Sequence, residues 1–533
     1  FPWFPVVVLG LVAIAIAVVQ WKPELERNLR AWATAALGLL GASLLLLWFL
    51  ASSRFRARTR LLGLAAVVVC GLILKASLRL DGTVNGTGLP RWVWRGNVRN
   101  PASMAPTEAV TAPNVAPTAA LVAPPKTPGV DPRPAALPGL DDVPQFFGPD
   151  RSGALPVARF STDWTARAPK ELWRRPIGLG WSAFAVVGGR AWTQEQSGDD
   201  EQVTCLDMAT GRTLWSHGER TRFSEWQGGD GPRATPTIQG NRVYAFGATG
   251  RLRCLDATDG RPLWKRAVLE ENGLGNITWG TSASPLLVDD LVVVTGGRGS
   301  GAVLFAYRQG DGTPVWKAGS GDASYASPVV ATLVGRRVIL SNNAASLTAH
   351  DPATGRLVFE HAWGGGKWPK ASQPVVLPGD RVFVSAGYGM GCQILQVTAA
   401  AGSPGEPATL KAETAWKGLT LKTQFNSPAL RQGFLYGLDD GLLACVDAGT
   451  GRRLWKDGRF GSGQSLLVGD VIVVQNENGT VHACAASPDG FRELGRIPAL
   501  TSKTWNHPTV AGRYLLARND REATCWELPA AGR

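Results

Sequence analysis

One eleven-residue pattern recurs along most of this chain and constrains its fold more than any other feature. It consists of an alternating strand, a turn that usually contains Asp and then Gly, and a second strand that delivers Trp or Phe. Clear copies are Cys205–Trp215, Cys254–Trp264, Ala306–Trp316, Ala349–Phe359 and Cys445–Trp455, and degenerate copies end near Trp416 and at Cys484–Arg496. Such self-similarity indicates a repeat architecture, in which each unit packs mainly against its neighbours.

The residue types of the pattern suit a tight turn between two strands, followed by a large aromatic residue. Asp can accept backbone N–H groups across the turn, and Gly tolerates a positive φ angle. The Trp or Phe can dock against the neighbouring blade and bury a large area. Five of the seven cysteines occupy equivalent positions in the repeats, so we expect small buried side chains rather than disulfides or metal ligands.

The first half of each unit is a strand pair, commonly introduced by Ser-Pro or Thr-Pro. Eight such halves occur: Ser182–Trp192, Thr235–Phe246, Ser284–Thr295, Ser327–Leu340, Gln373–Ser385, Ser427–Tyr436, Gln464–Val474 and His507–Ala517. Seven complete second halves follow, but the eighth, Thr524–Leu528, ends before its Trp-bearing strand. Glu171–Pro176 supplies a matching strand from the other end. The sequence therefore predicts an all-β, eight-bladed propeller that closes by pairing its first strand with its last blade.

Three apolar runs precede the repeats, and each approaches the roughly 20 residues that a membrane-spanning helix needs. They are Phe1–Val19, Ala31–Ala51 and Leu61–Leu78. The chain starts at Phe1 rather than at a methionine, so we expect further residues before it. The stretch from Arg54 to Arg60 holds four arginines and no acid, which predicts a cytoplasmic loop and a propeller on the outer side.

In the second run, Thr34, Gly38 and Ala42 lie four residues apart on one helix face. Small residues at this spacing allow close helix packing, either among the three spans or with a partner subunit. Pro101–Leu140 holds ten prolines and should form an extended tether. We therefore predict an anchor over residues 1–80, a Pro/Ala-rich linker over 81–142 and the propeller over 143–533.

The net charge of +13 is concentrated near the anchor, since residues 1–140 hold 14 Lys/Arg against 5 Asp/Glu. The propeller is nearly neutral, which argues against a nucleic-acid-binding surface.

The repeats resemble the tryptophan-docking repeats of quinoprotein dehydrogenases and of BamB-type outer-membrane assembly factors. The segment Pro144–Gly153, with the sequence PQFFGPDRSG, also resembles the lead-in of PQQ-binding-like β-propeller repeat proteins. The resemblance implies one of two classes. Dehydrogenases hold PQQ and Ca²⁺ in the central funnel and oxidise alcohols or sugars, whereas BamB-type propellers hold no cofactor and bind other envelope proteins.

Several features depart from the dehydrogenase pattern. The chain has no adjacent Cys-Cys pair and no Cys-x-x-Cys haem site. Ca²⁺ prefers hard oxygen ligands, but blade openings such as Gly231–Pro236 and Trp279–Ser282 are neutral or basic. The five histidines are scattered, with no metal-ligand spacing. We therefore expect no metal site and no cofactor, with PQQ and Ca²⁺ only under the dehydrogenase alternative.

Loops that open the blades converge on one mouth of a propeller, so their large polar and aromatic residues are the candidate ligand or partner site. These residues are Trp181, Arg233, Trp279, Tyr325, Lys370, Tyr388, Asn426, Trp505 and His507. Aromatic and cationic groups would suit an anionic or planar ligand. Alternatively, they fill and cap the channel.

Three hypotheses follow, all placing the chain in a bacterial inner membrane with its propeller on the periplasmic side. The favoured one is a non-catalytic scaffold that binds envelope proteins. The second is a membrane-bound PQQ-dependent alcohol or sugar dehydrogenase. The third is a subunit of a larger membrane complex, whose other helices contact the spans.

Overall fold

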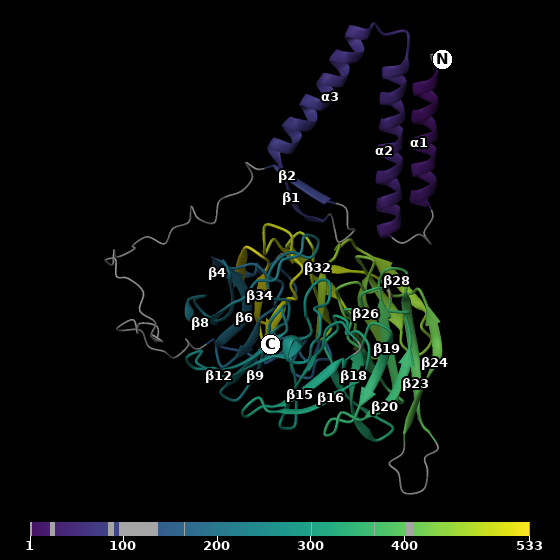
Figure 1. Ribbon diagram of the computed structural model, residues 1–533. Coiled ribbons are helices and arrows are strands. Elements are labelled where there is room, and N and C mark those ends of the chain that lie inside the picture. The colour runs from purple at the N-terminus through teal and green to yellow at the C-terminus, as the bar shows by residue number, and fades with distance from the viewer. Residues whose placement is uncertain are drawn as a thin grey trace, which may run out of the picture.

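The computed structural model describes residues 3–21, 27–83, 90–94, 137–164, 166–299, 301–366, 368–400 and 409–531. The C-terminal part is an eight-bladed β-propeller, with its sheets arranged around a central axis (Figure 1). Seven sheets have four strands and one has five. The predicted fold class is confirmed.

Within each blade the chain runs from the inner strand outward through antiparallel neighbours. The first four blades are β5 (Ala185–Val187), β6 (Arg190–Ser197), β7 (Asp200–Asp207) and β8 (Thr213–Arg220); β9 (Thr237–Gln239), β10 (Arg242–Phe246), β11 (Arg251–Asp256) and β12 (Pro262–Ala267); β13 (Leu286–Val288), β14 (Leu291–Thr295), β15 (Leu304–Arg308) and β16 (Pro314–Ala318); and β17 (Val329–Leu333), β18 (Arg336–Asn342), β19 (Ser346–His350) and β20 (Leu357–Ala362). A short helix, α4 (Val268–Glu271), follows β12.

The last four blades continue the same order. They are β21 (Val375–Leu377), β22 (Arg381–Ala386), β23 (Gly391–Ala399) and β24 (Leu410–Gly418); β25 (Ala429–Arg431), β26 (Phe434–Asp439), β27 (Leu442–Asp447) and β28 (Arg453–Asp457); β29 (Gln464–Val468), β30 (Val471–Gln475), β31 (Val481–Ala485) and β32 (Glu493–Ile497), joined by β3 (Ala154–Leu155); and β33 (Thr509–Ala511), β34 (Tyr514–Arg518) and β35 (Glu522–Glu527), joined by β4 (Lys170–Pro176).

The ring closes where β4 pairs antiparallel with β35, as the displaced strand predicted. Trp173 on β4 lies opposite Cys525 on β35. Its indole Nε1 donates a 2.9 Å hydrogen bond to the carbonyl of Met208 in the first blade. The closing strand therefore docks on its neighbour as the other repeats do.

The docked tryptophans join consecutive blades through one repeated contact. Trp215 donates to the Ala257 carbonyl of the next blade at 3.1 Å, and its ring covers Gly260, whose φ is +75°. Trp316 contacts Pro352 and Gly355 in the same way. A side chain at either glycine would collide with the indole, so Gly serves both the turn and the docking.

The recurring Asp and Cys residues of the pattern also have the expected roles. Asp207 Oδ1 accepts the N–H groups of Ala209 and Thr210 across the turn. The five repeat cysteines are buried free thiols, and four lie directly opposite a docked Trp, as Cys254 lies opposite Trp264.

The seventh blade departs from the rule because Glu493 stands where the other blades place Trp or, in the fourth blade, Phe359. Glu493 lies opposite Cys484. Trp164, from the segment before β4, packs its ring against Gly495 of the same strand. It belongs to the buried core cluster of the seventh and eighth blades. A tryptophan from outside the repeats thus covers this blade.

The N-terminal part contains three apolar helices, α1 (Phe4–Trp21), α2 (Arg27–Ala51) and α3 (Ala57–Ser77). All three are long and apolar enough to cross a membrane. Gln20 of α1 donates to Thr34 Oγ1 of α2 at 2.9 Å. Of the predicted small-residue face, Thr34 makes this contact, whereas a Cβ built at Gly38 would meet no atom within 4 Å. Gly41, which was not in the predicted set, lies against Val12 of α1.

A small two-stranded sheet, β1 (Leu78–Thr83) with β2 (Pro90–Trp94), follows α3 within the region predicted as linker. Of the predicted Pro-rich tether, residues 101–136 lie outside the described residues. The described remainder packs on the propeller, because Leu137 and Leu140 contact the core between the eighth and first blades.

Candidate functional site

One face of the propeller, here called the mouth, is formed by two sets of loops. The first leads from the outer strand of each blade to the inner strand of the next, and the second joins the two middle strands of a blade. Tyr388 lies on a loop of the second set, between β22 and β23. The other eight candidate residues lie on loops of the first set, as predicted.

Hydroxyl groups of the Ser-Pro and Thr-Pro openings connect successive blades around the mouth. The Ala183 N–H donates to Thr235 Oγ1, the Thr235 N–H to Ser284 Oγ, and the Ser284 N–H to Ser327 Oγ, at 2.9–3.2 Å. Each hydroxyl satisfies a buried N–H of the preceding blade, which explains why Ser or Thr recurs there. The loops that carry the candidate residues are thereby fixed to one another.

The channel behind the mouth contains a segment of the chain itself, Val143–Leu155, which we call the plug. Val143 exchanges backbone hydrogen bonds with Val186 of the first blade, and Pro144 accepts from Ile238 of the second. At its other end, β3 pairs parallel with the inner strand β29. The plug enters and leaves on the side opposite the mouth, where Asp142 and Leu155 accept from turn residues Gly188 and Gly469.

Arg151, near the tip of the plug, is buried and contacts three blades. Its guanidinium donates to the carbonyls of Pro328 at 2.9 Å, Ser284 at 3.3 Å, and Pro285. Its own carbonyl accepts from Gln373 Nε2 of the fifth blade at 3.1 Å. Burial lowers the pKa of Arg151 to about 9, which still leaves it charged at neutral pH. This residue holds the plug beneath the mouth.

Trp181 and Trp505 meet at the mouth, with ring centroids 5.1 Å apart. Phe425 also packs against Trp505, with ring centroids 5.5 Å apart. The Lys503 ammonium lies 4.2 Å from the Trp505 ring and 5.1 Å from the Trp181 ring. Trp505 Nε1 donates to the buried Glu477 carboxylate at 2.8 Å. Three blade openings are thus joined into one aromatic cluster that contains a cation.

Trp279 and Tyr325 form a second cluster, with centroids 5.6 Å apart. Arg233 lies near it, with its guanidinium 4.5 Å above the Phe223 ring and its N–H groups on carbonyls of the Gly228–Gly231 turn. Burial lowers the pKa of Arg233 to about 10. The same turn joins the two clusters, because Gly228 accepts from Trp181 and lies against Trp279.

Lys370 is buried and points away from solvent. Its ammonium donates to the carbonyls of Asn343, Ala344 and Trp363 at 2.6–3.0 Å, and burial lowers its pKa to about 7. Nearby, Tyr388 stacks on the exposed Trp368, with nearly parallel rings 5.5 Å apart. Lys370 therefore joins neighbouring blades, while the Trp368–Tyr388 pair lies at the surface.

The last two candidates are interior residues. Asn426 is buried and exchanges hydrogen bonds with the backbone of Leu438. His507 is buried against Phe146 and Phe147 of the plug, with ring centroids 5.4 and 5.1 Å away. Burial lowers the pKa of His507 to about 4. These two side chains support the mouth from within and do not face a ligand.

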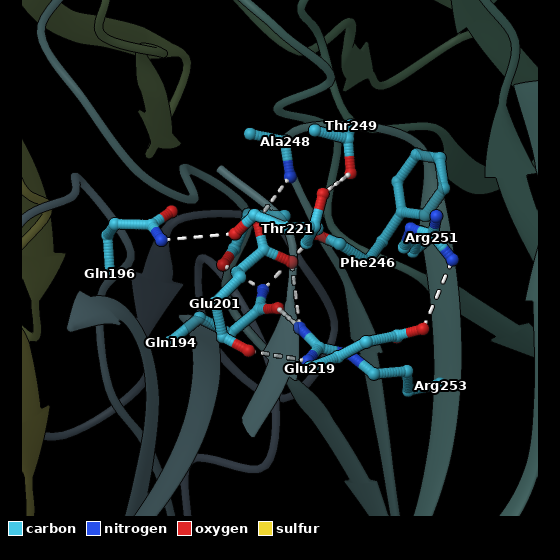
Figure 2. A network of polar contacts seen from close by, with 12 residues as sticks. Gln194, Gln196, Glu201, Glu219, Thr221, Phe246, Ala248, Thr249, Arg251 and Arg253 are labelled. Carbon is cyan, nitrogen blue, oxygen red and sulfur yellow. Dashed lines mark hydrogen bonds and ion pairs between the residues drawn. The ribbon is translucent and has the colours of Figure 1, made fainter. Parts of the chain in front are cut away.

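Beneath Arg233, a buried polar network joins the first two blades (Figure 2). Glu201 of β7 forms a 2.8 Å ion pair with Arg253 of β11, and both side chains are almost fully buried. Glu201 also accepts from the Ala248 N–H at 2.9 Å. Burial raises the pKa of Glu201, and Arg253 opposes that shift. Gln194 donates to the Ala234 carbonyl at 2.8 Å, which links the network to the mouth loop.

Two carboxylates of the mouth, Glu225 and Glu477, are held by hydrogen bonds. Ca²⁺ takes six to eight oxygen ligands, several of them carboxylates. Glu477 is engaged by the Trp505 indole and the Ser462 N–H, and Glu225 by the N–H groups of Gln227 and Gly228. Within the described ranges, no three His, Cys, Asp or Glu side chains are grouped to hold a metal ion.

Four further residues that shape the mouth were not predicted: Arg151, Phe425, Glu477 and Lys503. Phe425 and Lys503 lie within two residues of the predicted Asn426 and Trp505. A prediction that included every large residue of the blade-opening loops would have contained them. Glu477 and Arg151 carry no local signal, since their partners come from other blades or from the plug.

Comparison with known proteins supports the repeat assignment. The family model described as outer membrane protein assembly factor BamB matches residues 199–457. BamB from Moraxella catarrhalis is 17% identical with a TM-score of 0.50, over 68% of this chain and 100% of that one. Quinohemoprotein alcohol dehydrogenase from Comamonas testosteroni is 13% identical with a TM-score of 0.54, and the match covers 74% of this chain and 81% of that one. A search of curated proteins finds no match.

At these identities, the structural similarity shows a shared fold and does not extend to the activity of either protein. The family match falls on the blades with the clearest docked tryptophans, and both neighbours share the propeller architecture. The chain therefore carries an eight-bladed β-propeller whose blades over residues 199–457 match the BamB repeat family.

Proposed function

We propose that this protein is a membrane-anchored scaffold whose propeller mouth binds another protein. The observation that carries the proposal is that the chain itself fills the channel. The plug is hydrogen-bonded to the inner strands beneath the mouth, and Arg151, His507 and Lys370 are satisfied by carbonyl groups. Because the channel behind it is filled, the mouth offers a surface to a partner rather than a pocket to a small substrate.

The mouth loops also present large apolar side chains to solvent. Trp226, Trp368 and Leu419 are all exposed, and each lies between the outer strand of one blade and the inner strand of the next. Aromatic residues such as Trp are enriched among the residues that dominate binding energy at protein interfaces. These three are the residues we expect a partner to cover.

We further infer that the propeller lies on the periplasmic side of a bacterial inner membrane. The arginine-rich turn between α2 and α3 supports this orientation, because short cytoplasmic loops are enriched in Lys and Arg. An envelope protein or another subunit of a membrane complex is then the expected partner. The BamB repeat match is consistent with this choice.

The test uses the full chain extracted from its native membrane in mild detergent, with the mass of the assembly measured under native conditions. The mouth variant Trp226→Ser/Trp368→Ser/Leu419→Ser should lose the partner's mass. A matched control, Val157→Ser/Val315→Ser/Leu357→Ser, removes three exposed apolar side chains outside the mouth loops and should retain it. A monomeric wild-type chain, or equal retention by both variants, would contradict the proposal.

We also propose that the mouth takes neither PQQ nor Ca²⁺, because its carboxylates are already engaged by N–H groups. Purified protein incubated with both should not reduce an electron-accepting dye with alcohols or sugars. Sustained turnover that needs both additions would instead support the dehydrogenase alternative.

A further inference from the structure

The small sheet after α3 presents two tryptophans on one side. Leu78 pairs with Trp94, and Leu80 pairs with Trp92. Trp92 and Trp94 are alternate residues of β2, so their side chains point to the same face. They are 56% and 57% exposed. A two-stranded sheet is at best marginally stable alone in water, so a surface that covers both indoles would stabilise it.

The length of α3 sets the depth of this sheet. Its 21 residues, at 1.5 Å each, extend about 32 Å, which matches the roughly 30 Å hydrocarbon core of a bilayer. No loop separates helix and sheet: the Leu78 N–H donates to the Leu74 carbonyl, while its φ of −107° and ψ of 150° already belong to a strand. If α3 crosses the membrane, β1 begins where hydrocarbon meets the headgroups. Figure 1 shows the sheet at this end of α3.

The chemistry of the segment suits that boundary. Tryptophan is enriched at membrane–water interfaces, where an apolar ring and a polar N–H are both accommodated. The stretch from residue 75 to residue 95 also holds one acid, Asp81, and four basic residues, Lys75, Arg79, Arg91 and Arg95. Basic residues next to a span are attracted to anionic phospholipids.

We propose that the β1–β2 sheet lies in the interface of the bilayer that α3 crosses, with Trp92 and Trp94 among anionic headgroups. This lipid contact would fix the start of the tether and limit the positions that the propeller can reach. The proposal rests on anchoring by the helices and adds a lipid-binding site beyond them.

The test uses the full chain in nanodiscs of phosphatidylglycerol and phosphatidylcholine. Hydroxyl-radical footprinting with mass spectrometry measures the oxidation rate of each tryptophan. Trp226, a propeller residue that is also 57% exposed, is the matched reference. We expect Trp92 and Trp94 to oxidise at least fivefold more slowly than Trp226. Phosphatidylglycerol that carries a photoactivatable headgroup should form adducts on residues 90–94, and Trp92→Ser/Trp94→Ser should lose them.

Alkylation of Cys70 in α3 reports whether α3 crosses the membrane, independently of where the sheet lies. Blocked alkylation of Cys70 by a soluble maleimide, with Trp92 and Trp94 oxidised as fast as Trp226, would refute the interfacial sheet and leave the anchor intact. Free alkylation of Cys70 would refute both. Slow oxidation without lipid adducts would show that protein covers the sheet, which also overturns the proposal.

Discussion

Replacing Arg253 with Met should destabilise the propeller strongly, because it leaves the Glu201 carboxylate buried without its cation. Both side chains are almost fully buried, and the ion pair is 2.8 Å long. After the substitution, the Ala248 N–H is the remaining hydrogen-bond donor that contacts this carboxylate. Removing one partner of a buried pair typically costs about 3–5 kcal/mol. Glu201→Gln should have an effect in the same range, since it strands the guanidinium.

The double variant Glu201→Gln/Arg253→Met should be more stable than the sum of its parts predicts. It buries no charge, so the desolvation penalty of the single variants disappears. We expect a loss of about 1–2 kcal/mol, from weakened hydrogen bonds and packing. The coupling between the two sites should therefore exceed about 3 kcal/mol, far above the scatter of independent sites.

Thermal unfolding followed by tryptophan fluorescence measures these effects. An unfolding entropy of about 2.1 cal/mol/K per residue, over roughly 390 propeller residues, makes 1 kcal/mol worth about 1.2 °C. Each single variant should then lower Tm by about 4–6 °C, and the double variant by about 2 °C. Arg337→Met removes an exposed ion pair with Asp289 and should shift Tm by less than about 1 °C. Additive single effects would refute the reasoning.

Three further predictions follow from individual contacts. The pKa of His507 falls from 6.5 to about 4 on folding, so the unfolded chain binds more protons between these pH values. The free energy of unfolding should therefore be unaffected by His507 above pH 6.5 and should fall by about 3 kcal/mol towards pH 4. His507→Gln should remove this dependence when Tm is measured against pH. Gly355→Ala places a Cβ 2.7 Å from the Trp316 ring, whereas Gly335→Ala, at nearly the same positive φ, meets open space; Gly355→Ala should lower Tm clearly more, and equal shifts would argue against the docking role. Arg151→Ala removes the side-chain donor of the Ser284 and Pro328 carbonyls and should cost about 3 kcal/mol. Arg159→Ala breaks an exposed pair with Asp141 and should have little effect on urea denaturation.

The blades could be predicted because each repeat carries its contacts within about fifty residues. Asp207 caps its own turn, and Trp215 docks on the turn of the next repeat, so the local pattern already contains the interactions that hold a blade. Ring closure was predictable for a related reason. A unit that lacks its last strand leaves an unpaired edge, and Glu171–Pro176 was the matching segment. Its pairing with β35 confirms the inference.

The small sheet after α3 was missed although its sequence holds a signal. Trp92 and Trp94 alternate with Arg91 and Val93, the period-two pattern of a strand. The prediction of a linker over residues 81–142 instead followed the Pro- and Ala-rich composition of residues 101–140. A strand pair this short gains little from propensity, so its neighbours decide whether it forms.

The plug could not be placed from sequence, because its energetics come from contacts between distant segments. Arg151 contacts Ser284 and Pro328, which are 133 and 177 positions away, and no periodicity links them. The lead-in was recognisable only as a motif, without a location. Once the ring has closed, its inner strands present backbone groups and apolar side chains to the channel. The plug forms hydrogen bonds with those backbone groups and packs against those side chains. The nine candidate residues lie on loops of the mouth, yet His507 and Lys370 are bonded inward, as is Arg151 of the plug. Their cationic and imidazole groups contact neighbouring carbonyls, so we propose that a partner would instead contact the exposed side chains of Trp226, Trp368 and Leu419.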